Sequence, residues 1–79
     1  MKIIKSIRAE RIKGFTSIFK DNSNNIFYLV NGKYHRKNGP AIEWSNGYKE
    51  WYLHGEFATS EEEFYNPLWR KRVEIKIFL

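Results

Sequence analysis

Cysteine is absent from the 79-residue sequence, and histidine, proline and methionine are scarce. Without cysteine the chain can form no disulfide, and its two histidines, His35 and His54, rarely make a metal site by themselves. The sequence shows no Ser-His-Asp set with supporting spacing, no nucleophile elbow and no glycine-rich phosphate loop, and its only aspartate is Asp21. We therefore expect a protein that is not an enzyme and that carries neither a metal nor another cofactor.

Long apolar runs are also missing. The start of the chain, residues 1–5, does not read as a secretory signal, and no segment approaches the roughly 20 apolar residues that a membrane span requires. The lack of cysteine fits a reducing compartment. We expect a cytoplasmic protein with no membrane partner.

The chain is short but rich in aromatic residues. Its 79 residues predict one domain, residues 1–79, which buries a modest fraction of its surface. Three tryptophans, five tyrosines and six phenylalanines can compensate, because each ring buries a large area. The net charge is +5. The cations gather at the two ends, as Lys2, Lys5, Arg8, Arg11, Lys13 and Lys20, and as Arg70, Lys71, Arg72 and Lys76. This charge favours acidic partners such as nucleic acid, although an ordinary soluble surface explains it equally well.

Evenly spaced glycines organise the middle of the chain. Asn31-Gly32, Asn38-Gly39 and Asn46-Gly47 are followed by His54-Gly55, and Asn-Gly is the strongest short-range hairpin signal. Aromatic and β-branched residues fill the intervals, which favours strands. We predict an antiparallel β-meander over residues 26–57. Two-residue turns would pair Val30 with Lys33 in one hairpin, and Trp44 with Lys49 in another.

A repeat lies within the meander. When the chain is shifted by 23 residues, residues 28–34 lie over residues 51–57, with Gly32 over Gly55. The pattern breaks after Phe57, as expected of a terminal unit.

The residues of this repeat resemble a known family. His35-Arg36-x-x-Gly39-Pro40-Ala41, Trp44-x-Asn46-Gly47 and Lys49-Glu50-Trp51-Tyr52-Leu53-x-Gly55 are similar to the variant MORN-type repeat of small phage and bacterial proteins. The resemblance implies β-hairpins without catalytic residues, and related repeats bind proteins or membranes. Asn38 stands where the family usually has Asp, the next His-Arg pair is missing, and residues 1–25 and 58–79 lie outside the match.

Strand alternation assigns side chains to two faces of the meander. With the two-residue turns above, the core face carries Pro40, Ile42, Trp44, Trp51 and Leu53, and the solvent face carries Glu43, Ser45, Tyr48, Glu50 and Tyr52. A second apolar set, Phe27, Leu29 and Tyr34 with Arg36, faces away from Tyr28, Val30 and His35. Because aromatic rings lie on both faces of the sheet, each face has to be shielded from water, by the chain termini, by the helix or by a partner.

The two ends of the chain complete the predicted fold. Residues 2–7 and 15–19 are predicted as strands, the first extending towards Ile12, although a basic helix over residues 6–13 is an alternative. A double capping box from Thr59 and Ser60 predicts a helix over residues 59–72, which either ends before Pro67 or restarts there. Residues 73–79 alternate strictly and predict a terminal strand. The fold class is therefore mainly β (α+β): an antiparallel β-meander of tight Asn-Gly hairpins with one short C-terminal helix and a terminal strand.

Two groups of side chains are candidates for binding a partner. Aromatic and basic residues interleave on the meander as Tyr34, Arg36, Tyr48 and Tyr52, and the segment Trp69, Arg70, Lys71 and Arg72 joins a large ring to three cations. Trp and Arg are enriched at interface hot spots. The ordinary explanations are that the rings cover the protein's own helix and that the cations sit at a helix end. His35 and His54 are expected to be structural.

These observations indicate a non-catalytic binding protein that occupies the surface of a larger partner. The family resemblance implies a phage-type accessory protein, in the host cytoplasm, that inhibits or modulates a host protein or protein complex, such as a defence or CRISPR complex. One alternative is a basic nucleic-acid-binding module that uses aromatic and Arg/Lys contacts. Another is a self-associating structural protein, a homodimer formed through the edge strand at residues 73–79.

Overall fold

The chain forms a β-sheet followed by a helical carboxyl end. The computed structural model describes residues 3–7 and 17–77, with side chains described from residue 17 on. Its described elements are β1 (Ile3–Ile7), β2 (Ser17–Asp21), β3 (Ile26–Val30), β4 (Lys33–Tyr34), β5 (Ile42–Glu43), β6 (Lys49–Leu53), β7 (Glu56–Ala58), α1 (Glu61–Tyr65) and α2 (Pro67–Ile77). The fold class predicted from the sequence, mainly β with α+β character, is confirmed.

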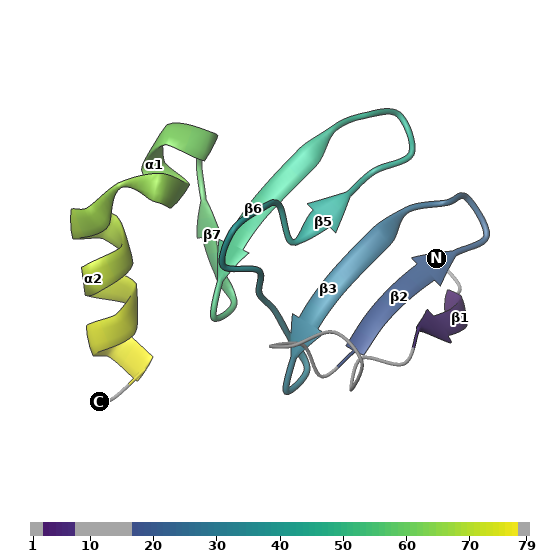
Figure 1. Cartoon of the computed structure of the whole chain (residues 1–79), viewed down its shortest axis with the longest axis horizontal. Helices are drawn as coiled ribbons and strands as arrows, with labels where there is room; N and C mark the ends of the chain where they lie inside the picture. The colour runs from purple at the N-terminus through teal and green to yellow at the C-terminus, as the bar shows by residue number, and fades with distance from the viewer. Residues whose placement is uncertain (1–2, 8–16, 78–79) are drawn as a thin grey trace.

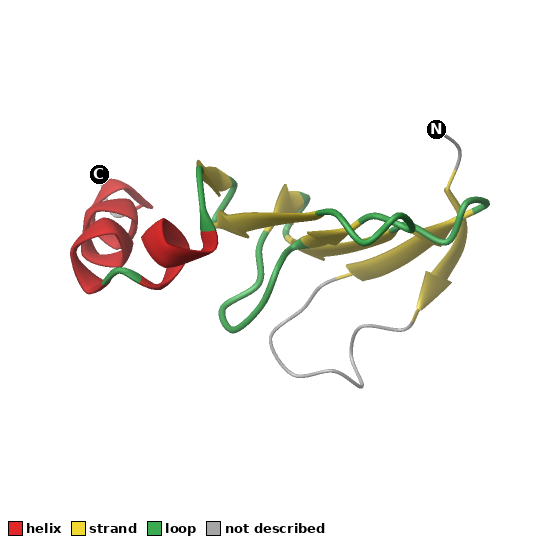
Figure 2. Cartoon of the chain, turned by 90° about the horizontal axis from the view of Figure 1, so that it is seen from above, coloured by secondary structure: helices red, strands yellow, loops and turns green. Residues whose placement is uncertain are grey.

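All strand pairs are antiparallel, and the order across the sheet is β1-β2-β3-β5-β6-β7, with β4 paired to the end of β3 (Figure 1). The two amino-terminal strands are present, the second at residues 17–21. The predicted extension of the first strand towards Ile12 lies outside the described residues. The start of the second predicted strand, at Phe15, lies outside them as well. Seen from above, the strands form a single layer with both helices beside its β7 end (Figure 2).

Two hairpins of the repeat have the predicted turns. Asn31 and Gly32 have φ angles of 51° and 78°, and His54 and Gly55 have φ angles of 52° and 83°. Positive φ at both central residues defines a type I′ turn, whose twist matches that of the flanking strands. The predicted pair Val30–Lys33 is confirmed, and Leu29 pairs with Tyr34 as the same two-residue turn requires. His54 therefore occupies the left-handed turn position assigned to it.

The third hairpin differs from the prediction by one residue. Ile42 pairs with Glu50 and Glu43 with Lys49, so the predicted Trp44–Lys49 pair is wrong. Only Gly47, with φ of 92°, is left-handed, and its N–H donates to the Trp44 carbonyl at 2.9 Å. The loop is thus three residues, 45–47, with Gly47 as the bulge residue.

A contact from far along the chain stabilises this longer loop. The Asn25 side-chain oxygen accepts the N–H of Ser45 at 2.7 Å, and its amide nitrogen donates to Asp21 at 3.0 Å. Asp21 also accepts the N–H groups of Ser23 and Asn25, both at 2.9 Å. Burial alone raises the pKa of Asp21, but these hydrogen bonds leave it below its ordinary value.

The register changes which side chains share a face. A shift of one residue moves a strand's side chains to the other side of the sheet. Ile42 and Trp44 therefore share a face with Glu50 and Tyr52, and not with Trp51 and Leu53 as predicted from the two-residue turn.

The helices cover the other side of β6 and β7. Leu53, Ala58, Phe64 and Val73 form a buried cluster against which Trp51 and Trp69 pack. Of the two predicted capping boxes, the one at Ser60 is formed in part: Ser60 is the N-cap, and its Oγ accepts the N–H of Glu63 at 3.1 Å. The Glu63 carboxylate reaches back to the N–H of Thr59, one residue before the cap, at 2.9 Å.

The helix restarts at Pro67, and the predicted terminal strand at residues 73–79 is wrong. The Asn66 side chain accepts the N–H of Leu68 at 2.8 Å, so Asn66 caps α2 with Pro67 at its first position. Residues 73–77 are the last part of α2, and residues 78–79 lie outside the described residues. Val73 is buried whereas Ile75 and Ile77 are 52% and 44% exposed, which suits a helix and not a half-buried strand. The homodimer alternative requires an edge strand at residues 73–79, and the described part of that segment, residues 73–77, is helical instead.

Candidate functional site

A row of five aromatic rings crosses one side of the sheet. The ring centroids are 5.7 Å apart between Trp44 and Phe27, 6.2 Å between Phe27 and Tyr34, 5.2 Å between Tyr34 and Tyr52, and 5.4 Å between Tyr52 and Phe57. The rings come from β3, β4, β6 and β7 and from the residue after β5. We call this side the aromatic face. The tight hairpins produce this row of rings, because each turn places an aromatic side chain of one strand next to a side chain of the neighbouring strand.

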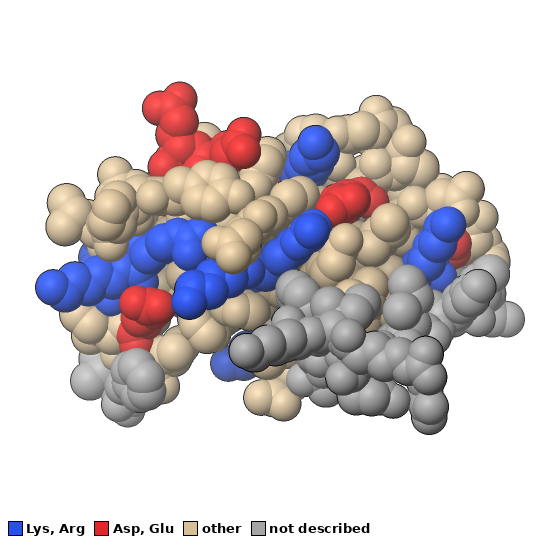
Figure 3. Space-filling model, in the orientation of Figure 1, with Lys and Arg blue, Asp and Glu red and all other residues tan. Residues whose placement is uncertain are grey.

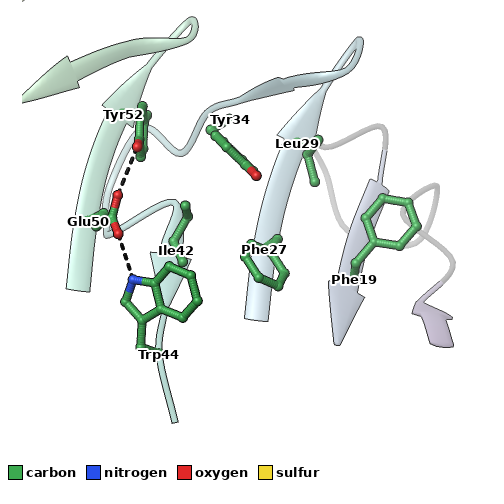
Figure 4. Close-up of a pocket in the computed structure, with 8 residues that line it drawn as sticks. All are labelled: Phe19, Phe27, Leu29, Tyr34, Ile42, Trp44, Glu50 and Tyr52. Atoms are coloured by element: carbon green, nitrogen blue, oxygen red, sulfur yellow. Dashed lines mark hydrogen bonds between the residues drawn. The ribbon is translucent and has the colours of Figure 1, made fainter. Parts of the chain in front are cut away.

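The aromatic face is hollowed at its centre into a pocket of about 440 Å³. Its lining residues, drawn in Figure 4, are Phe19, Phe27, Leu29, Tyr34, Ile42, Trp44, Glu50 and Tyr52. Phe27 and Ile42 are buried, whereas Tyr34 is 37% exposed. We call this hollow the aromatic pocket. Its volume lies in the range of small-molecule sites and suits one side chain of a partner.

Among the described residues that line the aromatic pocket, Glu50 is the one that is acidic. Its carboxylate accepts Trp44 Nε1–H at 2.7 Å through Oε2 and the Tyr52 hydroxyl at 2.8 Å through Oε1 (Figure 4). Burial, together with the hydrogen bond to Glu50 and its charge, raises the pKa of Tyr52 to about 12. Tyr52 therefore remains a neutral donor near neutral pH, and both polar groups of these rings are directed at the carboxylate.

Of the four predicted binding residues on the meander, two meet in this pocket. Tyr34 and Tyr52 line it side by side. Tyr48 lies at the end of the β5–β6 hairpin and is 62% exposed, outside the pocket lining.

Arg36 does not lie on the aromatic face, contrary to the prediction. Its guanidinium carbon is 4.1 Å from the ring centroid of Tyr28, and its Nη1 donates to Glu43 at 2.5 Å and to the Pro40 carbonyl at 3.2 Å. The N–H of His35 still donates to the Tyr28 carbonyl of β3 at 3.1 Å, but the N–H of Arg36 donates to the Tyr52 carbonyl of β6 at 3.2 Å. The β3–β4 hairpin therefore does not set the side of the sheet on which Arg36 lies. Glu43 therefore pairs with Arg36, whereas Glu50, which the sequence placed on the same face as Glu43, bonds to Trp44 and Tyr52.

The predicted cluster at residues 69–72 is dispersed around α2. Trp69 packs on the buried core and Arg70 is held internally, donating to the carbonyls of Phe64 at 2.8 Å and Lys37 at 2.7 Å. Lys71 and Arg72 are exposed. Consecutive residues on a helix point in different directions, so the four side chains do not form one contact surface. Figure 3 shows Lys and Arg side chains in a row across the middle of one face of the molecule.

His35 has the structural role that the sequence suggested. Its Nδ1 accepts the backbone N–H of His54 at 2.8 Å, and the two rings lie 4.3 Å apart. Burial, followed by the neighbouring His54, Arg70 and Lys37, lowers the pKa of His35 to about 4. The ring is therefore neutral at physiological pH.

Sequence reasoning missed several residues of the pocket, above all Trp44 and Glu50. The two-residue turn assigns Trp44 to the core face and Glu50 to the solvent face, on opposite sides of the sheet. The local signal, Asn46-Gly47, fits both a two-residue turn and a three-residue loop with a glycine bulge, and only the second brings these two side chains together.

Other chemistry is limited in the part of the chain that the structure describes. Residues 17–77 contain no group of three or more His, Cys, Asp or Glu side chains arranged to hold a metal ion. None of the described helices has the length and apolar character needed to cross a bilayer.

A comparison of the chain with protein-family models, with curated proteins and with solved structures finds no match. What the aromatic face does must therefore follow from its own geometry.

Proposed function

We propose that this chain is a small non-catalytic binding protein whose aromatic face receives a side chain of a partner protein. The observation that carries the proposal is the aromatic pocket, a hollow of about 440 Å³ walled by rings on a sheet face that no described helix covers. Tyrosine and tryptophan dominate protein-binding hot spots because a rigid ring gains much contact area at a small cost in conformational entropy.

The arrangement of the rings favours binding over reaction. Each ring of the aromatic face is held by at least one neighbouring ring, so little order has to be created when a partner docks. The Glu50 carboxylate in the pocket already accepts two hydrogen bonds, from Trp44 and Tyr52. A pre-formed, anchored surface of this kind is suited to recognition.

The kind of partner follows from the resemblance to MORN-type repeats. Within that resemblance, the chain is a phage-type accessory protein that inhibits or modulates a host protein complex by occupying its surface. This part of the proposal is an analogy at the level of the family. It predicts a stoichiometric partner in a bacterial lysate.

A nucleic-acid partner is the second candidate, favoured by the row of Lys and Arg side chains in Figure 3. Two of the cations near the sheet–helix junction are engaged internally, Arg36 with Glu43 and Arg70 with backbone carbonyls. On the aromatic face itself, Glu50 repels phosphate. Both facts favour the protein partner.

The test is affinity capture from a bacterial lysate, with and without nuclease, using the native chain and the Tyr34→Ala variant. Tyr65→Ala is the matched control, since Tyr65 is a tyrosine of α1 with similar exposure, 43% against 37% for Tyr34, and it does not line the pocket. One protein partner that survives nuclease, and is lost with Tyr34→Ala but kept with Tyr65→Ala, supports the proposal.

Two results would count against it: loss of every partner after nuclease, and unchanged capture by a folded Tyr34→Ala variant. Salt dependence separates the two candidates further. Nucleic-acid binding weakens steeply between low and moderate salt, whereas an interface centred on rings weakens little.

A further inference from the structure

We propose that the aromatic pocket selects a cationic side chain, an alkylammonium such as lysine or its N-methylated forms. This inference rests on the proposed function, because it names the chemistry that the same pocket recognises. The relevant observation is the combination of aromatic rings with one carboxylate, that of Glu50, among the described lining residues, which include no Lys or Arg.

The shape of the pocket suits a linear side chain with a bulky head. Figure 4 shows Ile42 between Glu50 and Phe27, with Tyr52 and Tyr34 above it and Trp44 below it. Ile42 is 3% exposed and forms the floor. The rings of Tyr34 and Tyr52 contact each other, with centroids 5.2 Å apart, so they form one wall of the pocket. An alkyl stem entering from solvent would lie against this wall and place its head group above Ile42.

The electrostatics of the pocket favour positive charge. The face of an aromatic ring is the negative part of its quadrupole, so several ring faces around one site attract a cation. Glu50 adds a full negative charge at the wall. The two donors that would otherwise attract an anion, Trp44 Nε1–H and the Tyr52 hydroxyl, are both bonded to Glu50.

A neutral occupant would be bound less well. A neutral apolar group that fills the pocket removes water from the Glu50 carboxylate and gives it no new partner, and burying a charge without compensation is costly. A cation removes the same water but supplies the opposite charge. A phosphate or a second carboxylate would be repelled. The pocket therefore discriminates by charge as well as by shape.

The experiment is an NMR titration of ¹⁵N-labelled protein with two small probes of equal shape. One is Nα-acetyl-trimethyllysine amide, and the other is its neutral analogue with carbon in place of the ammonium nitrogen. The readout is the indole N–H signal of Trp44. The indole signals of the other two tryptophans, Trp51 and Trp69, serve as internal references, because neither residue is among those that line the pocket. Thermal melting of each variant checks that it folds.

We expect the cationic probe to shift the Trp44 signal saturably and the neutral analogue to bind roughly tenfold more weakly, as one desolvated cation–π site implies. Glu50→Gln should weaken the cationic probe by a similar factor. Glu56→Gln is the matched control, because Glu56 pairs with Lys76 at 3.4 Å outside the aromatic pocket, and it should bind as the native chain does. Tyr34→Leu, which leaves Glu50 in place, should also weaken binding if Glu50→Gln does not fold.

The inference is overturned if the neutral analogue binds as tightly as the cation, if neither probe shifts Trp44, or if a single-stranded oligonucleotide shifts it instead. These results are separable from failure of the proposed function. Partner capture that depends on Tyr34, combined with indifference to the charge of the probe, would retain the binding function and reject the cationic ligand.

Discussion

The Nδ1 atom of His35 accepts the backbone N–H of His54 at 2.8 Å, which joins the loop after β4 to the tight turn between β6 and β7. Only a ring nitrogen without a proton can accept this bond, so protonation of His35 at Nδ1 breaks it. The two hairpins of the repeat are therefore linked by a contact that depends on pH.

Acidification should destabilise the protein through His35. Its pKa is about 4 in the folded chain and 6.5 when exposed, so the unfolded chain binds more protons between these values. The contribution of neutral His35 to the free energy of unfolding is fully present above pH 6.5 and is lost as the pH falls towards 4. Because the ring is partly exposed and its charge is screened by solvent, we expect this loss to be about 1 to 2 kcal/mol. Urea unfolding at several pH values measures the slope.

The matched variant for that experiment is His35→Asn, whose side-chain oxygen can accept the same N–H but does not titrate. It should flatten the slope between pH 6.5 and 4. His54→Asn keeps a residue that tolerates the left-handed turn and should leave the slope of His35 largely in place. An unchanged slope in His35→Asn would mean that another group titrates.

Val73 and Ile75 should differ sharply when each is replaced by alanine. Val73 is 4% exposed in the cluster with Leu53 and Phe64, so Val73→Ala removes buried methyl groups and should cost about 1 to 2.5 kcal/mol. Ile75 is 52% exposed on α2, and Ile75→Ala should change the free energy of unfolding by less than about 0.5 kcal/mol, because alanine favours helices. Thermal and urea unfolding give both values. Equal, large losses would indicate the half-buried strand that the sequence alternation suggested.

Gly39 should be intolerant of a side chain because of Arg36. A β-carbon at Gly39 would lie 2.9 Å from Arg36 Nε, which is too close, while the guanidinium is fixed by Tyr28 and Glu43. Gly39→Ala should therefore cost about 1 kcal/mol by displacing Arg36. In an Arg36→Ala background the same change should cost little, and a double-mutant cycle measures the difference. Additive losses would place the cause in the backbone of Gly39 itself.

The success of sequence reasoning depended on whether the deciding contact was local. The type I′ turns at Asn31-Gly32 and His54-Gly55, and the cap at Ser60, are specified by residues within one turn, and they were predicted correctly. The loop at residues 45–47 is stabilised from Asn25, twenty positions away. No local pattern contains that contact, and the resulting shift of one residue exchanged the two faces of β6.

The carboxyl end shows the same limit. Alternation over residues 73–79 is a period of two, but Asn66 and Pro67 start a helix that continues to Ile77. The helix start at Asn66 and Pro67 thus outweighed the short alternation of apolar residues after Val73. Once the first turns of α2 have formed, each further residue adds a helical hydrogen bond at little cost, so the helix extends through the alternating segment. Within the candidate site, the sequence identified Tyr34 and Tyr52. It did not predict the register of β5 against β6, which places Trp44 and Glu50 beside them.

Site-specific photo-crosslinking shows whether a partner protein docks at the aromatic pocket. A benzophenone amino acid replaces Tyr34 in the aromatic pocket, or Tyr65 on α1 as the control, and each folded protein is irradiated in nuclease-treated bacterial lysate. The account predicts a single protein adduct from position 34, competed by the native chain, and none from position 65. Capture of a partner by the native chain with no adduct at position 34, or with the adduct at position 65 alone, would contradict it.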